Sequence, residues 1–309
     1  MQRSPRRTGA EVPSAGEPSE RGMRIRGRTF TPQELLAIKA LVDASPEEHR
    51  FALSKRICKS LGWHQPNGRL KDRSCRDVLA RLHDIGYLHL PAPRRAAVRR
   101  RPVPLTERTA PRGAAVVRPL DVEQACFSIV TGASDPKREM LWNEYVERYH
   151  YLGYGVPLGA HVKYFVVVGG EPIACLSFGG AAWRIEARDR WIDWSEERRE
   201  RNLRHVVNNT RFLIFPWIEV RNLASRVLAL AARRVTDDWL RLYAYRPLLL
   251  ETFVDPARHA GTCYKAANWL FVGYTKGRGR QDRHFKSDQP KKAVLLYPLV
   301  KDASSLLRA

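Results

Sequence analysis

Two apolar runs joined by a pair of glycines constrain the fold of this chain most strongly. The stretch VKYFVVVGGEPIACLSFGG, residues 162–180, places Gly169 and Gly170 between segments rich in β-branched and aromatic residues. Such a pair is a strong signal for a β-hairpin, because glycine adopts the positive φ angles that tight hairpin turns require. The chain is therefore expected to contain a sheet with at least one antiparallel pair of strands.

Helices and strands alternate around this hairpin. The apolar periodicities predict, in order, a helix at 136–149, the hairpin, a charged helix from Ser195 to about Val207, a strand at 210–216, a long helix from about Asn222, a strand at 247–255, a short helix, and strands at 270–276 and 293–300. This order predicts an α/β (α+β) mixed sheet with flanking helices.

A smaller helical module is expected before this sheet, over residues 29–91. TPQE at 31–34 predicts a capped helix through about Ala44, and a second short helix is expected from Ser54 to about Leu61. A third helix within 71–86 carries outward cations, and YLHLP, 87–91, is expected to form a strand. The outward cations are Lys71, Arg73, Arg76 and Arg81. This order predicts a winged helix-turn-helix whose third helix meets DNA, or else a three-helix module with a solvated basic face.

Charge and composition define the remaining segments and the class of partner. The chain has 54 Lys and Arg against 32 Asp and Glu, a net charge of +22, which favours a polyanionic partner such as DNA. We interpret residues 1–28 as a disordered basic tail, 92–118 as an Arg/Pro-rich linker, and 119–309 as the larger domain. No run is apolar enough to span a membrane and no secretory signal is present, so a cytoplasmic protein with reduced thiols is expected.

The region from Thr210 to Thr275 resembles the core of the Gcn5-related acetyltransferase (GNAT) family. The stretch TCYKAANWLFVGYT, 262–275, carries this resemblance, which places Tyr264 at the position of the general acid. It implies that acetyl-CoA would bind where the loop PWIEVRNLAS, 216–225, enters the long helix. This loop contains no glycine, and a Cβ at Ala224 or Arg226 would push a pyrophosphate away from the backbone, which disfavours acetyl-CoA. Glu219 would be the base of such an enzyme; half-buried packing is the alternative role of Tyr264.

The chain as a whole resembles the Druantia anti-phage protein A (DruA) family, some members of which lie beside or within transposase genes. The phrases that carry this resemblance are YHYLG (149–153), NNTRFLI (208–214), RNLAS (221–225), LETFVD (250–255), GTCYKAANW (261–269) and GRGRQDR (277–283). The resemblance implies a bacterial protein that acts on or near DNA in phage defence or mobile-element biology. Its partners would be DNA and other system proteins, such as a helicase or a transposase.

Two carboxylates in the strand LETFVD are candidates for catalysis. Glu251 and Asp255 are four residues apart and point to the same face of a strand, where they could hold Mg²⁺ for phosphodiester chemistry. In the alternative, Glu251 pairs with an arginine such as Arg211, and Asp255 caps the following turn. Because no third carboxylate or His is fixed to them by spacing, the sequence assigns no metal ligand. It likewise fixes no cofactor.

Two further stretches offer contacts to nucleic acid. The stretch KGRGRQDRHFK, 276–286, combines cations with glycines, which suits a phosphate-contacting loop or a solvated turn. The candidate phosphate contacts in this stretch are Lys276, Arg278, Arg280 and Arg283. The tyrosines of YHYLG could act as a DNA nucleophile or, alternatively, pack as core aromatics.

The leading interpretation is a DNA-binding component of a Druantia-like defence system or of a transposon-associated system. The first alternative is a Mg²⁺-dependent nuclease or strand-transfer enzyme in the larger domain. The second is an N-acetyltransferase of the GNAT type. Whether the chain is an enzyme is open at this point.

Overall fold

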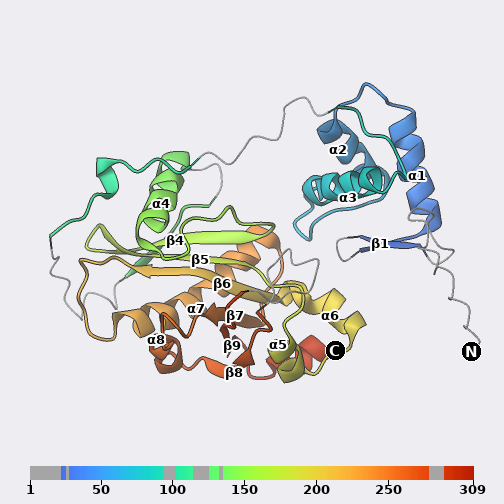
Figure 1. Cartoon of the computed structure of the whole chain (residues 1–309). Helices are drawn as coiled ribbons and strands as arrows, with labels where there is room; N and C mark the ends of the chain where they lie inside the picture. Colours follow the sequence, from blue (N-terminus) through green and yellow to red (C-terminus); the bar gives the residue numbers. More distant parts are fainter. Residues whose placement is uncertain (1–21, 26–27, 93–101, 114–124, 132–134, 278–288) are drawn as a thin grey trace, which may run out of the picture. The chain divides into compact units, whose positions relative to one another are not determined.

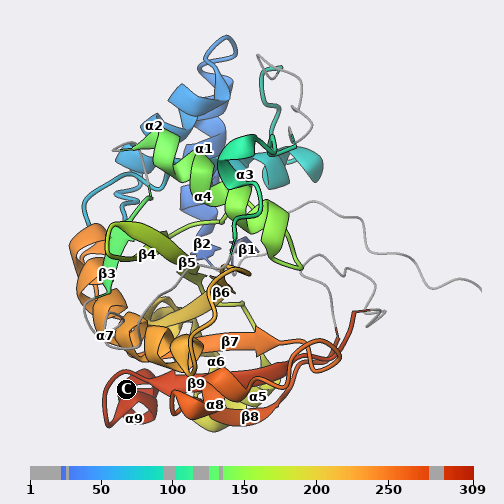
Figure 2. The same cartoon turned by 90° about the vertical axis from the view of Figure 1, so that its left-hand side faces the viewer.

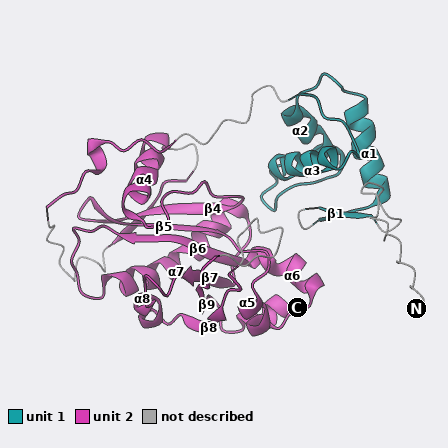
Figure 3. Cartoon of the chain, in the orientation of Figure 1, with its two compact units in different colours: residues 1–99 teal, residues 100–309 magenta. Residues whose placement is uncertain are grey.

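The chain folds into two compact units, residues Met1–Arg99 and Arg100–Ala309 (Figure 3). The computed structural model describes residues 22–25, 28–92, 102–113, 125–131, 135–277 and 289–309. None of the helices within these ranges combines the length and the hydropathy needed to cross a bilayer.

Unit 1 consists of a small hairpin followed by three helices (Figure 1). Its elements are β1 (Met23–Ile25), β2 (Arg28–Phe30), α1 (Pro32–Asp43), α2 (Arg50–Ser60) and α3 (Asp72–Asp84). The two strands pair antiparallel, and the helices enclose a core that includes Phe30, Leu35, Ile57 and Leu79. The three expected helices are therefore present.

The ends of the first two helices show what the sequence did and did not predict. The capping box at α1 is as expected, because Thr31 accepts from the backbone N–H of Glu34 and Glu34 accepts from that of Thr31. By contrast, α2 begins at Arg50 rather than at Ser54. The reason is that Nδ1 of His49 accepts a hydrogen bond of 2.9 Å from Ala52 N and so caps the helix four residues before the expected start.

The strand expected at Tyr87–Pro91 is wrong, since residues 87–92 form no strand. Leu88 and Leu90 are buried, so the alternating apolar pattern was real. The ring of His83 lies between their backbones, with Nδ1 3.2 Å from Leu88 O and 3.4 Å from Leu90 N. The His83 side chain thus contacts backbone groups that would otherwise pair with a neighbouring strand. The helical module is confirmed, but its wing is not shown.

Unit 2 is built on a seven-stranded mixed sheet with the order β3-β4-β5-β6-β7-β9-β8. The strands are β3 (Cys126–Ile129), β4 (His161–Val168), β5 (Glu171–Gly180), β6 (Val206–Ile214), β7 (Leu249–Val254), β8 (Leu270–Tyr274) and β9 (Ala293–Pro298). Every neighbouring pair is antiparallel except β6 and β7. Figure 2 shows β7, β9 and β8 side by side at one end of the sheet. The hairpin at Gly169 and Gly170 is confirmed, and both glycines have positive φ.

Helices cover both faces of this sheet. They are α4 (Pro136–Tyr149), α5 (Glu186–Ile192), α6 (Glu196–Asn202), α7 (Leu223–Tyr243), α8 (Thr262–Ala266) and α9 (Ala303–Arg308). Phe165 packs on Tyr145 of α4, whereas its neighbour Tyr164 donates to Asp238 of α7. Because successive side chains of a strand alternate in direction, α4 and α7 lie on opposite faces. The expected mixed sheet with flanking helices is confirmed, although β3, α5 and α9 were not predicted.

Part of the predicted linker belongs to unit 2 and packs on α4. Residues 107–109 form a single 3₁₀ turn, and its neighbour Thr106 donates from its backbone to Glu144 of α4. Thr109 donates to the same carboxylate at 2.7 Å, and its carbonyl accepts from the hydroxyl of Tyr149 at 2.6 Å. Burial alone would raise the pKa of Glu144, but these hydrogen bonds outweigh it and lower the pKa. Composition predicted no such contacts.

A buried ion pair fixes the start of β7 to the segment that follows β5. Arg188 and Glu251 are both fully buried, and Arg188 Nη1 donates to Glu251 Oε2 at 2.9 Å. Glu251 Oε1 accepts from Ala182 N, while Asp189 accepts from the other edge of the guanidinium. Glu251 thus pairs with an arginine, as the alternative interpretation expected, but this arginine is Arg188 of α5 and not Arg211.

Removal of this charge should destabilise unit 2. We expect Glu251→Gln to cost about 3 kcal/mol in the free energy of unfolding, because it leaves the buried Arg188 only partly compensated. Urea denaturation followed by tryptophan fluorescence measures this difference. Asp237→Asn, which removes an exposed partner of Arg246, is the matched control and should have little effect. Equal stability of the two variants would contradict the role assigned to the pair.

Candidate functional site

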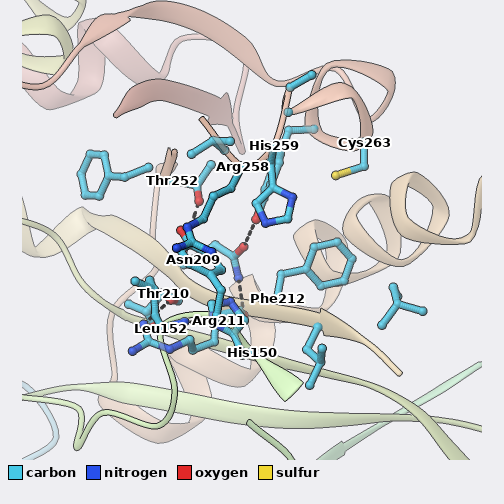
Figure 4. Close-up of a pocket in the computed structure, with 18 of the residues that line it drawn as sticks. His150, Leu152, Asn209, Thr210, Arg211, Phe212, Thr252, Arg258, His259 and Cys263 are labelled. Atoms are coloured by element: carbon cyan, nitrogen blue, oxygen red, sulfur yellow. Dashed lines mark hydrogen bonds between the residues drawn. The ribbon is translucent and has the colours of Figure 1, made fainter. Parts of the chain in front are cut away.

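A cavity of about 550 Å³ opens where β6 and β7 separate. The two strands pair in parallel at only three positions, Val206 with Leu249, Val207 with Leu250 and Asn208 with Glu251. Beyond Asn208, β6 stays paired with β5, and β7 stays paired with β9. The space left between them is lined by residues 149–152, 209–214, 252–254 and 258–264 (Figure 4).

Asn209 connects the diverging strands at the floor of the cavity. Its Nδ2 donates to the carbonyls of Ser177 and Arg211, at 3.1 and 3.2 Å. Its Oδ1 accepts a 2.6 Å hydrogen bond from the hydroxyl of Tyr264, and its backbone carbonyl accepts from Thr252 of β7. The side-chain amide and the backbone carbonyl of this one buried residue thereby join β5, β6, β7 and α8.

Tyr264, the candidate general acid, belongs to this floor. Its ring packs against Phe212 and Trp269, and burial raises the pKa of its hydroxyl. Since that hydroxyl already donates to Asn209, the geometry is that of a packed aromatic with a satisfied polar end.

The mouth of the cavity carries exposed rings and an arginine. The guanidinium carbon of Arg258 lies 5.3 Å from the ring centroid of Tyr151. The ring centroid of His259 lies 5.4 Å from the same Tyr151 centroid. Arg258 Nε is 3.9 Å from Asp255 Oδ2, a distant contact for an ion pair. Asp255 also accepts from Ala257 N at 3.1 Å, so it caps the turn after β7 as the alternative reading expected.

A neutral histidine lies on the wall. The pKa of His150 is lowered to about 4 by burial and by the positive fields of Arg211 and His259. Its Nδ1 accepts from Leu152 N at 3.2 Å, so the neutral ring carries its proton on Nε2. Arg211 is held by the carbonyls of Gly153 and Thr210, at 2.9 and 2.7 Å.

Glu251 and Asp255, the two candidate carboxylates, are not part of a metal site in the described residues. Both oxygens of Glu251 accept hydrogen bonds, Oε1 from Ala182 N and Oε2 from Arg188, while Asp255 accepts from Ala257 N in the turn after β7. Among the residues that the structure describes, no three His, Cys, Asp or Glu side chains are arranged to hold a metal ion.

The residues that would receive acetyl-CoA fit it poorly. The N–H of Leu223, at the start of α7, donates to Val220 O, and Asn222 before it has a positive φ of 60° without glycine. Glu219 is exposed and does not line the cavity, and the Tyr264 hydroxyl is engaged. No acetyl-transfer step is therefore derived for this chain.

The candidate nucleic-acid contacts lie in both units. Arg73, Arg76 and Arg81 are exposed on α3, and Lys71 is half-buried immediately before it. Lys276 follows β8 and pairs with Glu186 at 2.5 Å. Arg278, Arg280 and Arg283 lie outside the described residues.

Several cavity residues were not predicted as site residues. Asn209, Arg258 and His259 come from segments far apart in the sequence and meet only because β6 and β7 diverge. The polar run Asn208–Thr210 inside an apolar strand was the one sequence signal that pointed to a buried polar floor.

The depressed pKa of His150 predicts a pH dependence of stability. Between pH 6.5 and 4 the unfolded chain binds a proton that the folded chain does not, so stability falls as the pH falls through this window. From pH 7 to pH 5 the wild type should lose about 2 kcal/mol more than His150→Asn, which keeps an acceptor for Leu152 N but does not titrate. Urea denaturation at the two pH values measures this; equal losses would refute it.

Solved structures of acetyltransferases are similar to part of this chain. Aminoglycoside acetyltransferase AAC(6')-Ib in complex with coenzyme A matches with a TM-score of 0.39 and 15% identity, covering 60% of this chain and 99% of that one. An aminoglycoside N(6')-acetyltransferase from Legionella pneumophila matches with a TM-score of 0.33 and 12% identity, covering 59% and 95%. A Bacillus subtilis acetyltransferase in complex with CoA gives 0.31 and 10%, covering 57% and 99%. These low scores carry no conclusion about activity.

The sequence, unlike these structural matches, establishes the family of the chain. No curated protein matches this chain. One protein family does match, over residues 87–286, and this range includes the cavity and the whole of β3 to β8. Because the match spans more than half of the sequence, the chain belongs to the family of the Druantia anti-phage protein DruA.

Proposed function

We propose that this chain is the DNA-binding component of a bacterial Druantia-like anti-phage defence system, or of a related transposon-associated system, and that α3 contacts duplex DNA. The observation that carries the proposal is the state of two arginines. The side chains of Arg73 and Arg81 are both exposed. Within the described part of the chain, neither has a hydrogen-bond or ion-pair partner. Cations without carboxylate partners are free to bind phosphates.

The neighbouring helix extends this cationic surface. Phe51 of α2 is 44% exposed, with Lys55 Nζ 4.3 Å and Arg76 Cζ 5.4 Å from its ring centroid. The opposite side of α3 is occupied by core residues such as Val78 and Leu82. The helix therefore has one buried face and one exposed face, on which Arg73, Arg76 and Arg81 lie beside the exposed Asp77 and Asp84. A recognition helix likewise packs with one face and presents the other to the major groove.

A second contact to the DNA backbone is proposed in unit 2, at Lys276 with Arg278, Arg280 and Arg283. Lys276 is 58% exposed but already pairs with Glu186, so its contribution should be smaller than that of the α3 arginines. The family implies other proteins of the defence system as partners, of which a helicase is one candidate and a transposase another. A cytoplasmic location agrees with this role. Among the residues that the structure describes, no arrangement favours the nuclease or the acetyltransferase alternative over this proposal.

Binding to duplex DNA should weaken with salt and depend on α3. For a duplex of about 20 base pairs of mixed sequence, Arg73→Ala combined with Arg81→Ala should lower the affinity at least about tenfold and reduce the salt slope by about 2. Fluorescence anisotropy at several salt concentrations measures both quantities.

The matched control removes two cations that are already paired in the same unit. Lys39 contacts Asp43 at 2.9 Å, and Arg56 contacts Glu48 at 2.8 Å. Lys39→Ala with Arg56→Ala should change the affinity much less than the α3 double variant does. Wild-type affinity and an unchanged salt slope in the α3 variant would overturn the proposal.

A further inference from the structure

We propose that the cavity between β6 and β7 binds a nucleoside phosphate, either free or as one nucleotide of a single strand. Neither the family nor the proposed duplex contact on α3 assigns a ligand to this cavity, which lies wholly within unit 2. Its volume of about 550 Å³ lies in the range of sites for small organic ligands.

The charge of the lining selects an anion. The described residues around the cavity include two arginines and two histidines but no carboxylate. Asp255, which precedes Arg258 by three residues and does not line the cavity, accepts from Ala257 N, and its Oδ2 lies 3.9 Å from Arg258 Nε. A phosphate at the mouth would therefore meet a positive field with little opposition.

Arg258 is the group best placed to hold the phosphate. Its side chain is 60% exposed, and it is positioned over the ring of Tyr151 without a close ion pair. A guanidinium presents parallel N–H donors that match two phosphate oxygens. Arg211, on β6, adds its charge from a position fixed by the carbonyls of Gly153 and Thr210 (Figure 4).

The remainder of the lining suits a flat, partly polar body such as a nucleobase. Phe212 and Phe253 supply apolar surface, and Tyr151 supplies an exposed ring. The hydroxyl of Thr252 donates to Asn209 O and leaves its oxygen as an acceptor. His150 also lines the cavity and stays neutral near pH 7, with its proton on Nε2. Aromatic rings beside a few polar groups are the usual surroundings of a bound base.

Coenzyme A is the competing occupant, and the structure argues against it. The loop before α7 lacks the glycines that would admit a pyrophosphate, and Tyr264 closes the floor through Asn209. A single nucleoside phosphate needs neither feature.

Calorimetry with the full chain tests the proposal. The ligands are 2′-deoxyadenosine 5′-monophosphate, 2′-deoxyadenosine, inorganic phosphate, coenzyme A and a five-nucleotide single strand. We expect the monophosphate to bind at least about tenfold more tightly than the nucleoside or inorganic phosphate. Tighter binding of the oligonucleotide would identify a strand as the source of the nucleotide, and tighter binding of the monophosphate would identify the free form.

Two variants place the ligand in the cavity. Arg258→Ala should weaken monophosphate binding at least about tenfold through loss of the charged hydrogen bonds. Ala260→Trp, at an exposed position of the lining, should block binding sterically with the charge unchanged. Arg198→Ala removes an exposed arginine of α6 outside the lining and should have no effect.

Three results would overturn the inference: no binding of the monophosphate or the oligonucleotide, equal loss in the Arg198 control, or preferential binding of coenzyme A that Ala260→Trp abolishes. The α3 double variant separates this site from the duplex contact. It should bind the monophosphate as the wild type does, so failure of one proposal leaves the other standing.

Discussion

The early separation of β6 and β7 is the constraint on which the rest of unit 2 depends. Two parallel strands that pair at three positions and then diverge leave backbone groups and side chains facing an open space. Asn209 satisfies some of these groups. Its side-chain amide bonds to β5 and α8, and its backbone carbonyl accepts from β7. The cavity is thus a direct consequence of the sheet, and its polar floor is what allows the strands to stay apart.

A second buried network holds the paired ends of these strands. Glu251 is the last residue of β7 that pairs with β6, and Arg188 fixes it to the segment after β5. A buried ion pair is weak support for stability in itself, but breaking one is costly because a charge is left without its partner. Glu251 therefore holds the closed end of the strand pair, while the cationic lining lies at the open end.

Local signals in the sequence predicted the elements well where one residue type determines the backbone. Gly169 and Gly170 gave the hairpin, and Thr31 with Glu34 gave the start of α1. The prediction failed where the local structure or the ion pair depends on a partner residue that the neighbouring sequence does not reveal. His83 replaced the partner of the expected strand at 87–91, and Arg188, 63 residues before Glu251, took the role considered for Arg211. The cavity could not be predicted, because its residues meet only through the register and divergence of two strands.

The central claim is that the chain recognises phosphates at two separate places, duplex DNA on α3 and a nucleoside phosphate between β6 and β7. Hydrogen–deuterium exchange of the full chain, with each ligand added in turn, tests this most directly. Duplex DNA should slow exchange in α3 and leave residues 149–153 and 258–264 unchanged, whereas 2′-deoxyadenosine 5′-monophosphate should do the reverse. Protection of the same segment by both ligands, or of neither segment by its own ligand, would contradict the claim.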